Sequence, residues 1–383
     1  MTIGIDIRVL ARGTRTGVEE YTLNLLQHLL PLDKTIKYKL FYNAFSKVKL
    51  DFPWLQLKNV SLRDFKIPNR PLFFSARYLN LPKIDNLLQG IDVYFNPHFF
   101  VAPLSKRCQR VVTFHDLSFV HFPYFFSWRK RFWQRFLMAA KKEAQKADQI
   151  IAVSESTKQD LVGLYQIKPA KIKVIYSGIS SKFKPAKKND QLRIKYNLPD
   201  SFILYFGTLE PRKNLTGLIR AFELVRQRHN IKLVIAGSRG WLYQKIFNEA
   251  ARSKFKDDIL FTGFVQEEDK PALYNLAELF IYPSFFEGFG FPPLEAMACG
   301  IPTIVAHSSS LPEVVADGAV MIDPYNIDEI AWTMEVVLKD KQVRQIIRQK
   351  GIDQAAKFSW SRCASETLEV LTDNKKAKNK FLA

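Results

Sequence analysis

The sequence predicts an α/β protein with two doubly wound domains, and three observations support this fold class. Strand-like and helix-like segments alternate along almost the whole chain, which is typical of parallel sheets with crossover helices. The 383 residues suffice for two domains of roughly 100–200 residues each. A polar, Lys-rich stretch at 181–191 separates two such series and is typical of an interdomain linker. We therefore expect Rossmann-like domains over 1–185 and 190–357 that face each other across a ligand cleft at the carboxyl ends of their strands.

Each element is predicted from its own apolar pattern. In the first half, the patterns predict strands at 3–7, 39–42, 93–96, 110–114, 149–153 and 171–175, and helices at 17–30, 126–147 and 154–165. Ser154 precedes the last of these helices, and its hydroxyl is suited to an N-cap. In the second half, they predict strands at 202–206, 232–236, 259–262, 279–282, 303–305 and 320–322, and helices at 215–228, 241–253, 270–276 and 292–299. Two final helices, 343–357 and 360–372, have no strand after them.

Composition excludes several classes of protein. No stretch reaches the roughly 18 continuous apolar residues that a membrane span needs. The N-terminus reads as a strand and lacks the pattern of a signal peptide. The three cysteines, Cys108, Cys299 and Cys363, are far apart and form no C-x-x-C pair, so neither a zinc site nor a disulfide framework is indicated. We expect a cytoplasmic protein.

The charge is the unusual feature of the composition. Lys and Arg number 57 against 37 Asp and Glu, a formal net charge of +20. Such a surplus favours an anionic partner, which can be nucleic acid, an acidic membrane surface or a phosphorylated small molecule. A general bias toward lysine is the plainer alternative. No nucleic-acid-binding signature accompanies the charge, so we expect no nucleic acid partner.

The segment 287–295 is the sharpest candidate for chemistry. Its sequence is EGFGFPPLE, in which Glu287 and Glu295 flank a strand-to-helix transition. Glycines such as Gly288 and Gly290 allow a close approach of the backbone to a ligand. A proline in the first turn of the following helix leaves free N–H groups for an anion. A turn with two incidental acids is the alternative interpretation.

A second candidate is the segment 207–214, GTLEPRKN, directly after a predicted strand. Adjacent Arg212 and Lys213 suit a diphosphate, because preorganised cations stabilise the charge that develops on a leaving diphosphate. An exposed basic loop is the alternative. The loop 12–18, before the first helix, resembles a phosphate-cradling glycine loop but matches no established motif.

Polar side chains also end strands of the first domain. His115 ends one predicted strand, and Asn96 and His98 end another. A strand-end histidine can hydrogen-bond a sugar, and a structural histidine is the alternative. No Asp-x-Asp occurs in the chain, so no paired-carboxylate metal site is indicated, and cations and a helix N-terminus would have to serve instead.

A basic, aromatic segment is a candidate for contact with an acceptor or a membrane. In a helix, Trp128, Phe132 and Phe136 would share one face, with Arg129 and Arg135 nearby. Such a helix can lie on an anionic membrane; a core-facing stripe with a solvated basic flank is the alternative.

Taken together, these blocks resemble the retaining GT-B glycosyltransferases of family 4, the group 1 glycosyltransferases. The resemblance covers about residues 2–372 and rests on the order and spacing of the blocks 3–6, 16–21, 114–117, 151–156, 206–214, 285–300 and 358–360. The blocks are most similar to those of bacterial mannosyltransferases of polysaccharide synthesis, including O-antigen and thus lipopolysaccharide.

The resemblance implies a role for individual residues. Glu287 would lie beside the transferred sugar, Glu295 would bind ribose hydroxyls, and Lys213 would pair with the diphosphate. The backbone of Gly17 would approach the phosphate and His115 would contact the donor sugar. Phe289 belongs to the same donor-binding motif.

One position departs from the family pattern. Many members carry Arg where this chain has Thr208, and we expect Arg212 to supply that cation. The resemblance also implies that the C-terminal helix, about 358–383, packs back on the first domain.

The resemblance implies a retaining, metal-independent hexosyltransferase, with GDP-mannose as the favoured donor and a glycan or lipid-linked acceptor. We expect the acceptor hydroxyl to attack on the face that the diphosphate leaves, with no cofactor beyond the nucleotide-sugar. A UDP-sugar-dependent transferase and a sugar-nucleotide epimerase of the same fold are alternatives, and a basic protein that docks on a membrane or partner is the non-enzyme alternative. A lipid-linked acceptor would make the protein peripheral at the inner face of the membrane.

Overall fold

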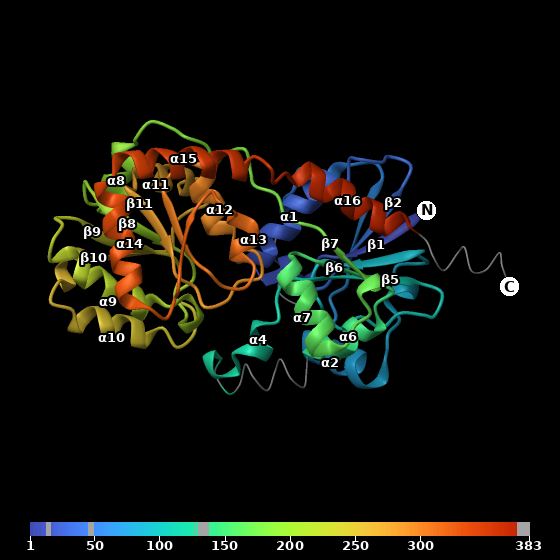
Figure 1. Ribbon diagram of the computed structural model, residues 1–383. Helices are drawn as coiled ribbons and strands as arrows, with labels where there is room; N and C mark the ends of the chain where they lie inside the picture. Colours follow the sequence, from blue (N-terminus) through green and yellow to red (C-terminus); the bar gives the residue numbers. More distant parts are fainter. Residues whose placement is uncertain (13–16, 45–49, 127, 129–137, 374–383) are drawn as a thin grey trace. The chain divides into compact units, whose positions relative to one another are not determined.

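The computed structural model describes residues 1–12, 17–44, 50–126, 128 and 138–373. The chain divides into two compact units (Figure 1). Apart from the residues outside the description, unit 1 comprises Met1–Leu117, Arg129–Gly178 and Trp360–Ala383, and unit 2 comprises Ser118–Trp128 and Ile179–Ser359.

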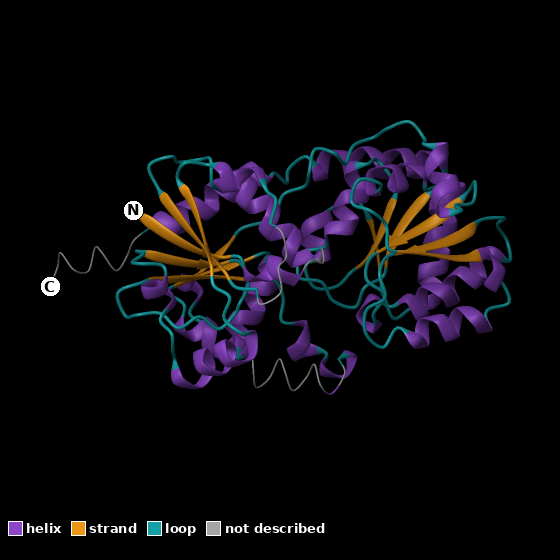
Figure 2. Ribbon diagram, turned by 180° about the vertical axis from the view of Figure 1, so that it is seen from behind, coloured by secondary structure: helices purple, strands orange, loops and turns teal. Residues whose placement is uncertain are grey.

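Unit 1 is built on a parallel sheet of seven strands in the order β3-β2-β1-β4-β5-β6-β7. The strands are β1 (Thr2–Asp6), β2 (Lys37–Tyr42), β3 (Val60–Asp64), β4 (Val93–Asn96), β5 (Gln109–Phe114), β6 (Gln149–Ala152) and β7 (Ile172–Val174). The helices are α1 (Gly17–Leu29), α2 (Asn69–Phe74), α3 (Ile84–Leu87), α6 (Ala140–Lys146), α7 (Glu155–Tyr165) and α16 (Trp360–Thr372). Figures 1 and 2 show α1 and α16 on one side of this sheet and α2, α6 and α7 on the other.

Unit 2 repeats the plan with a parallel sheet of six strands in the order β10-β9-β8-β11-β12-β13. The strands are β8 (Phe202–Phe206), β9 (Lys232–Ala236), β10 (Ile259–Gly263), β11 (Leu279–Tyr282), β12 (Thr303–Ala306) and β13 (Val320–Ile322). The helices are α4 (Ser118–His121), α8 (Asp190–Tyr196), α9 (Leu215–Arg226), α10 (Gln244–Arg252), α11 (Lys270–Leu276), α12 (Phe291–Ala298), α13 (Leu311–Val315), α14 (Ile327–Lys339) and α15 (Lys341–Ala355). The central strands are buried on both faces, as expected for sheets covered by helices.

The chain returns to unit 1 after completing unit 2. Helix α16 packs against α1, burying Trp360, Cys363 and Leu371, and the rings of Trp360 and Tyr21 are 5.9 Å apart. The second sheet is thus inserted between β7 and the last helix of unit 1.

The fold class predicted from the sequence is confirmed, with one error among the predicted helices. Ser154 caps α7, because its hydroxyl accepts a hydrogen bond from the Thr157 amide. The single helix predicted over 126–147 is wrong. Phe126 is extended (φ −107°, ψ 144°) and Ala139 is left-handed (φ 50°, ψ 40°), so helix α6 begins only at Ala140.

The order of the strands determines where a ligand can approach each unit. In both sheets the strand order reverses beside the first strand, between β1 and β4 in unit 1 and between β8 and β11 in unit 2. Ligands of open parallel sheets bind at the carboxyl ends of the strands beside such a reversal. The predicted cations follow β8, and Glu287 follows β11.

Candidate active site

The loop after β8 presents the two predicted cations from a fixed backbone. A 3-10 turn, Pro211–Lys213, is followed by Asn214 in the left-handed conformation (φ 54°), and α9 begins at the next residue. The buried Asn214 side-chain amide donates to the Pro324 carbonyl at 2.6 Å. This bond ties the loop to the connection between β13 and α14, so Arg212 and Lys213 have little freedom to move.

The ammonium group of Lys213 is buried among polar partners. It donates to the Tyr282 hydroxyl and to Oε1 of Glu287, both at 2.6 Å. Burial, together with the nearby Arg212 cation, lowers the pKa of Lys213, and the carboxylates of Glu287 and Glu210 offset part of that shift. The position is therefore suited to a cation only because a counterion accompanies it.

Glu287 supplies that counterion and is itself buried. Besides Lys213, its carboxylate contacts Arg212 at 3.1 Å and accepts from the Ser284 hydroxyl. Burial alone would raise the pKa of Glu287, but Arg212, Lys213 and these hydrogen bonds outweigh it and lower the pKa to about 2. Glu287 is thus ionised at neutral pH.

The cluster is electrically balanced. Arg212 also pairs with Glu210 at 2.7 Å and donates to the Phe286 carbonyl. Two cations, Arg212 and Lys213, therefore face two carboxylates, Glu210 and Glu287. An anionic ligand must share these cations with carboxylates that already neutralise them.

Helix α12 begins four residues after Glu287, and its start contains the predicted glycine and proline residues. Gly290 precedes the helix with φ +100° and ψ 57°, and a proline stands in the first turn. Because φ is positive at Gly290, and a Cβ atom on it would lie 2.7 Å from the Leu311 side chain, any residue other than glycine would be strained at this position. The Ser310 hydroxyl hydrogen-bonds to the carbonyls of Glu287 and Phe289, which holds the loop onto α13.

Glu295 lies inside α12 and is buried. Its Oε2 accepts a hydrogen bond from the Tyr274 hydroxyl of α11 at 2.8 Å. Burial raises the pKa of Tyr274 well above its usual value, so the phenol stays a donor. The structure thus fixes the orientation of this carboxylate, and its contact with ribose hydroxyls stays a prediction.

The other predicted donor-binding residues differ in exposure. Gly288 and Phe289 are buried in the α12 loop, and Thr208 is exposed in the β8 loop. The Phe289 ring packs edge-on against Phe291 and Phe358. In unit 1, Gly17 is the exposed first residue of α1, a helix whose first turn already carries Glu19 and Glu20.

An aromatic segment that the sequence analysis did not single out packs on the Glu287 loop. Within unit 2, the rings of His121 and Phe122 lie 5.2 and 5.8 Å from that of Phe286, and Phe125 stacks on Phe285 at 5.6 Å. Both segments carry runs of aromatic residues that are visible in the sequence. No feature of the sequence indicates that the two runs contact each other.

His115, the histidine predicted in unit 1, directly follows β5. Its surroundings keep the imidazole ring neutral. Its Nε2 lies 2.8 Å from the Pro97 carbonyl; a carbonyl can only accept, so Nε2 carries the hydrogen and Nδ1 is the acceptor nitrogen. The Tyr21 ring meets the His115 ring edge-on at 4.8 Å. Burial lowers the pKa of His115, and the Pro97 carbonyl and Asp116 offset part of the shift.

Asn96 ends β4, the strand beside β5, and His98 lies in the loop that follows it. The buried Asn96 side chain donates to the Phe100 carbonyl at 2.8 Å and accepts from the His98 amide at 3.3 Å. Asn96 thus shapes the loop that holds His98, whose ring is 5.8 Å from that of His115. The structure brings these three residues together, and their contact with an acceptor stays a prediction.

Of the basic, aromatic candidate segment, the structure describes only the first residue, Trp128. Trp128 is 68% exposed. Arg129, Phe132 and Arg135 lie outside the described residues.

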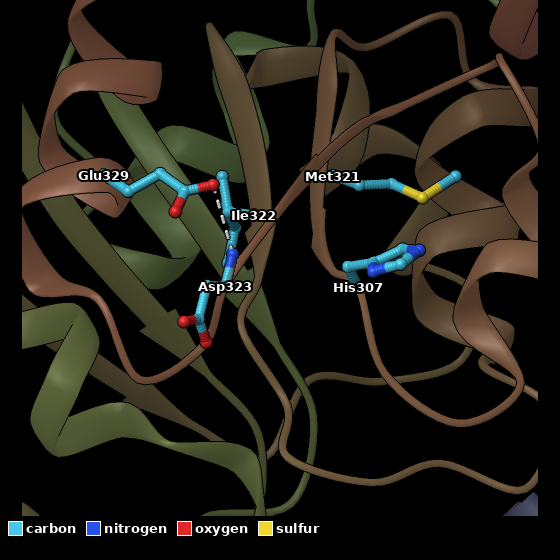
Figure 3. Close-up of a pocket in the computed structure, with 5 residues that line it drawn as sticks. All are labelled: His307, Met321, Ile322, Asp323 and Glu329. Carbon is cyan, nitrogen blue, oxygen red and sulfur yellow. Dashed lines mark hydrogen bonds between the residues drawn. The ribbon is translucent and has the colours of Figure 1, made fainter.

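Unit 2 also contains an open cavity that none of the predicted residues lines. It has a volume of about 430 Å³ at the ends of β12 and β13 and is lined by His307, Met321, Ile322, Asp323 and Glu329. Figure 3 shows the Asp323 amide donating to Glu329 on the side opposite His307 and Met321. Within the described ranges, no group of three or more His, Cys, Asp or Glu side chains could hold a metal ion.

The fold and this site place the protein in the GT-B class of two Rossmann-like domains, and comparisons identify the family. A model described as "Glycosyltransferase Family 4" matches residues 15–183, and one described as "Glycosyl transferases group 1" matches 187–354. The chain is 33% identical to the O-antigen chain mannosyltransferase B of Escherichia coli over 93% of this chain and 95% of that protein. The chain belongs to the family 4, group 1 glycosyltransferases.

A further relative agrees with this assignment, and solved structures share the fold. A serotype-specific mannosyltransferase of E. coli is 34% identical over 62% of this chain, which matches 30% of that longer protein. Among solved structures, the sucrose-phosphate synthase of Thermosynechococcus elongatus has a TM-score of 0.78 at 18% identity, covering 97% of this chain and 98% of that one. Anabaena HepE, solved with UDP and glucose, has a TM-score of 0.75 at 20% identity, covering 97% and 100%. The predictions of a GT-B fold and of a hexosyltransferase enzyme are thereby confirmed.

Proposed function

We propose that the protein is a retaining mannosyltransferase that uses GDP-mannose to extend a cell-surface polysaccharide. The observation that carries the proposal is the buried cluster of Arg212, Lys213 and Glu287 at the ends of β8 and β11. Similarity to two E. coli mannosyltransferases, one named for the O-antigen chain, supports the sugar and the class of product.

Charge stabilisation without a metal fits the cluster. Departure of the nucleoside diphosphate develops negative charge, which Arg212 and Lys213 would stabilise from fixed positions. The N–H groups at the start of α12 would add to this effect. We propose that these groups take the place of a divalent cation, and that Glu295 holds the ribose.

Attack on the face that the diphosphate leaves is the favoured mechanism. The pKa of Glu287 is lowered to about 2 because Arg212 and Lys213 outweigh the effect of burial. A carboxylate so weakly basic and bound by two cations is a poor nucleophile, which disfavours a double displacement. Its charge would instead stabilise an oxocarbenium-like sugar, while a leaving phosphate oxygen takes the acceptor proton. The neutral His115 would hydrogen-bond the donor sugar.

We propose a glycan or lipid-linked glycan as acceptor, with the protein working at the inner face of the membrane. None of the described helices is long and apolar enough to cross a bilayer. A peripheral attachment through basic surface residues would use the net charge of +20 on anionic lipids.

Calorimetry and thermal shift test the donor and the requirement for metal. The protein is titrated with GDP, UDP and their common sugar conjugates, with chelator present, because a ligand of the native state raises the melting temperature. We expect GDP-mannose to bind, and Lys213→Ala and Glu295→Ala to abolish binding. Lys195→Ala and Glu249→Ala, which break surface ion pairs of unit 2, are matched controls.

The outcomes separate the candidate functions. Preference for a UDP-sugar would replace the donor but keep the transferase, and binding only after addition of a divalent cation would refute metal independence. Conversion of the donor into an epimeric sugar nucleotide, or hydrolysis of the donor to its nucleoside diphosphate and an epimeric sugar, without any acceptor would indicate an epimerase. Nuclear magnetic resonance of the product linkage tests retention, and an inverted anomeric centre would contradict the mechanism.

A further inference from the structure

Four aromatic side chains of unit 2 form a continuous run of rings beside the Glu287 loop. The ring centres of Tyr124 and Phe125 are 4.7 Å apart, and Phe125 stacks on Phe285 at 5.6 Å. The ring of Tyr325 follows at 4.8 Å from that of Phe285. The two ends of the run are open to solvent, since Tyr124 is 62% and Tyr325 69% exposed. We call these four residues the four-ring surface.

Two of the four rings are attached to the loop that carries the predicted cations. The Phe285 amide donates to the Arg212 carbonyl at 2.9 Å. The carbonyl of Pro324, directly before Tyr325, accepts from the Asn214 side chain of the same loop. A ligand that covers these rings would therefore lie next to the proposed donor site.

The segment with the other two rings is also held in place. A 3-10 turn, Pro123–Phe125, presents Tyr124. The Trp241 indole N–H donates to the Phe125 carbonyl at 2.6 Å, and its ring stacks on Phe126 at 5.2 Å. Side chains on a backbone that is already ordered lose little further conformational entropy when a ligand binds.

The charge around the surface indicates the kind of ligand. Although the chain has a net charge of +20, the segment 118–128, SFVHFPYFFSW, contains no Lys, Arg, Asp or Glu. At the other end of the run, the Tyr325 amide donates to the carboxylate of the exposed Asp323 at 2.9 Å. An anionic headgroup or phosphate is attracted by cations, so this surface favours a neutral ligand instead.

The chemistry of tyrosine narrows the ligand further. Partial burial, with the nearby Tyr124 phenol and Asp323 carboxylate, raises the pKa of Tyr325, so its hydroxyl stays protonated at neutral pH and can both donate and accept. The face of an aromatic ring is the negative end of its quadrupole and attracts the polarised C–H groups on one face of a sugar ring. Rings with phenol hydroxyls thus suit a neutral polyol better than an acyl chain, which has no hydrogen-bonding group.

We propose that the four-ring surface binds the neutral glycan chain of the acceptor, so that sugar residues beyond the one that is extended contact Tyr124 and Tyr325. The identity of the glycan rests on the proposed function, whereas binding to the rings needs no donor. Binding energy from sugars remote from the reacting hydroxyl would favour long acceptors over short ones. The surface would therefore act as a subsite that selects for acceptor length.

Calorimetry of the full chain with α-linked mannotetraose tests the binding. We expect the double variant Tyr124→Ala, Tyr325→Ala to bind the tetraose about tenfold more weakly than the parent, because two stacked rings are lost. The double variant Tyr124→Phe, Tyr325→Phe keeps the rings and should lose less affinity. Trp332→Ala, which removes an aromatic side chain that is 66% exposed on α14, is the matched control and should bind like the parent.

Transfer kinetics give a readout that a merely structural role would not move. In the double alanine variant, the KM for mannotetraose should rise about tenfold, while the KM for GDP-mannose and the kcat with methyl α-mannoside should match those of the parent. A parent that does not bind mannotetraose would overturn the proposal. So would a double alanine variant with unchanged tetraose affinity and KM, whether it alters the oligomeric state, which would mark a protein interface, or the binding to anionic vesicles, which would mark a lipid surface.

Failure of the proposed function would give a different result. If no sugar nucleotide supports transfer by the parent, yet mannotetraose binds and the double alanine variant loses that binding, the transferase mechanism is refuted and the glycan surface remains.

Discussion

The carboxylate of Glu287 lies against two cations, so a diphosphate that approaches Arg212 and Lys213 also meets a negative charge. The Lys213–Glu287 contact is 2.6 Å and the Arg212–Glu287 contact is 3.1 Å. We therefore predict that Glu287→Gln binds GDP about tenfold more tightly than the parent, a change of about 1.4 kcal/mol, because the competing counterion is gone. Calorimetry measures the affinity.

The same substitution should abolish transfer and lower stability without ligand. Leaving buried cations without their carboxylate costs about 3–5 kcal/mol, so GDP should raise the melting temperature of the variant more than that of the parent. Glu249→Gln, which breaks a surface pair with Arg220, is the matched control. Weaker GDP binding in Glu287→Gln would show that Glu287 helps to hold the nucleotide.

His115 gives a prediction about pH. Burial lowers its pKa below the ordinary value of 6.5, so between these two values the unfolded chain binds a proton that the folded chain does not. Folding stability should therefore fall as the pH drops from about 7 through this window. His115→Gln, whose amide can still donate to Pro97, should show a shallower loss in denaturation midpoints between pH 7 and 5. An unchanged slope would mean that His115 binds its proton alike in the folded and unfolded chains, which would contradict the lowered pKa.

At the residue scale, the sequence revealed the groups that belong to compact motifs. Two short segments contain Arg212, Lys213, Glu287 and Glu295, so their spacing in the sequence was enough to predict them as site residues. Tyr282, Ser284 and Tyr274, which bond to Lys213, Glu287 and Glu295, carry no local mark of that role. Their contacts arise from the pairing of strands and helices that are far apart in the chain.

The same distinction applies to the elements. Strands buried on both faces are apolar runs and were predicted, whereas β3 is an edge strand with mostly exposed residues and shows no such run. Helix α8 was missed: it begins at the end of the predicted linker, 181–191, where Asn189 caps it by accepting a hydrogen bond from the Gln191 amide, and most of it lies beyond that linker. Helix α14 was missed although Asn326 caps it and Ile330, Met334 and Val337 follow a helical period, so the sequence contained a usable signal.

The start of α12 yields a prediction at the scale of an element. Gly290→Ala places a methyl group 2.7 Å from Leu311 at φ +100°, which should cost about 1–3 kcal/mol and weaken donor binding by shifting the helix N-terminus. A Cβ atom on Gly163 in α7 would meet no atom within 4 Å beyond its chain neighbours and its own helix backbone, so Gly163→Ala should stabilise by about 0.5–1 kcal/mol. Denaturant midpoints and GDP affinity measure both effects. An unshifted midpoint in Gly290→Ala would show that the α12 loop adapts.

The whole molecule is connected so that its last helix completes its first sheet domain. The chain leaves unit 1 at Gly178, builds unit 2 and returns at Trp360, and α16 buries Leu371 completely. We predict that Leu371→Asp destabilises unit 1 by about 3–5 kcal/mol through lost burial and a buried charge, and leaves unit 2 nearly unchanged. Ser365→Asp, which adds the same charge on the exposed face of α16, should have little effect. Hydrogen exchange resolved by segment distinguishes the units: protection should fall in α1 and β1 but persist in β8 and β11. Equal loss of protection in both units would show that they unfold together, and the stability of the second sheet would then depend on the helix that follows it.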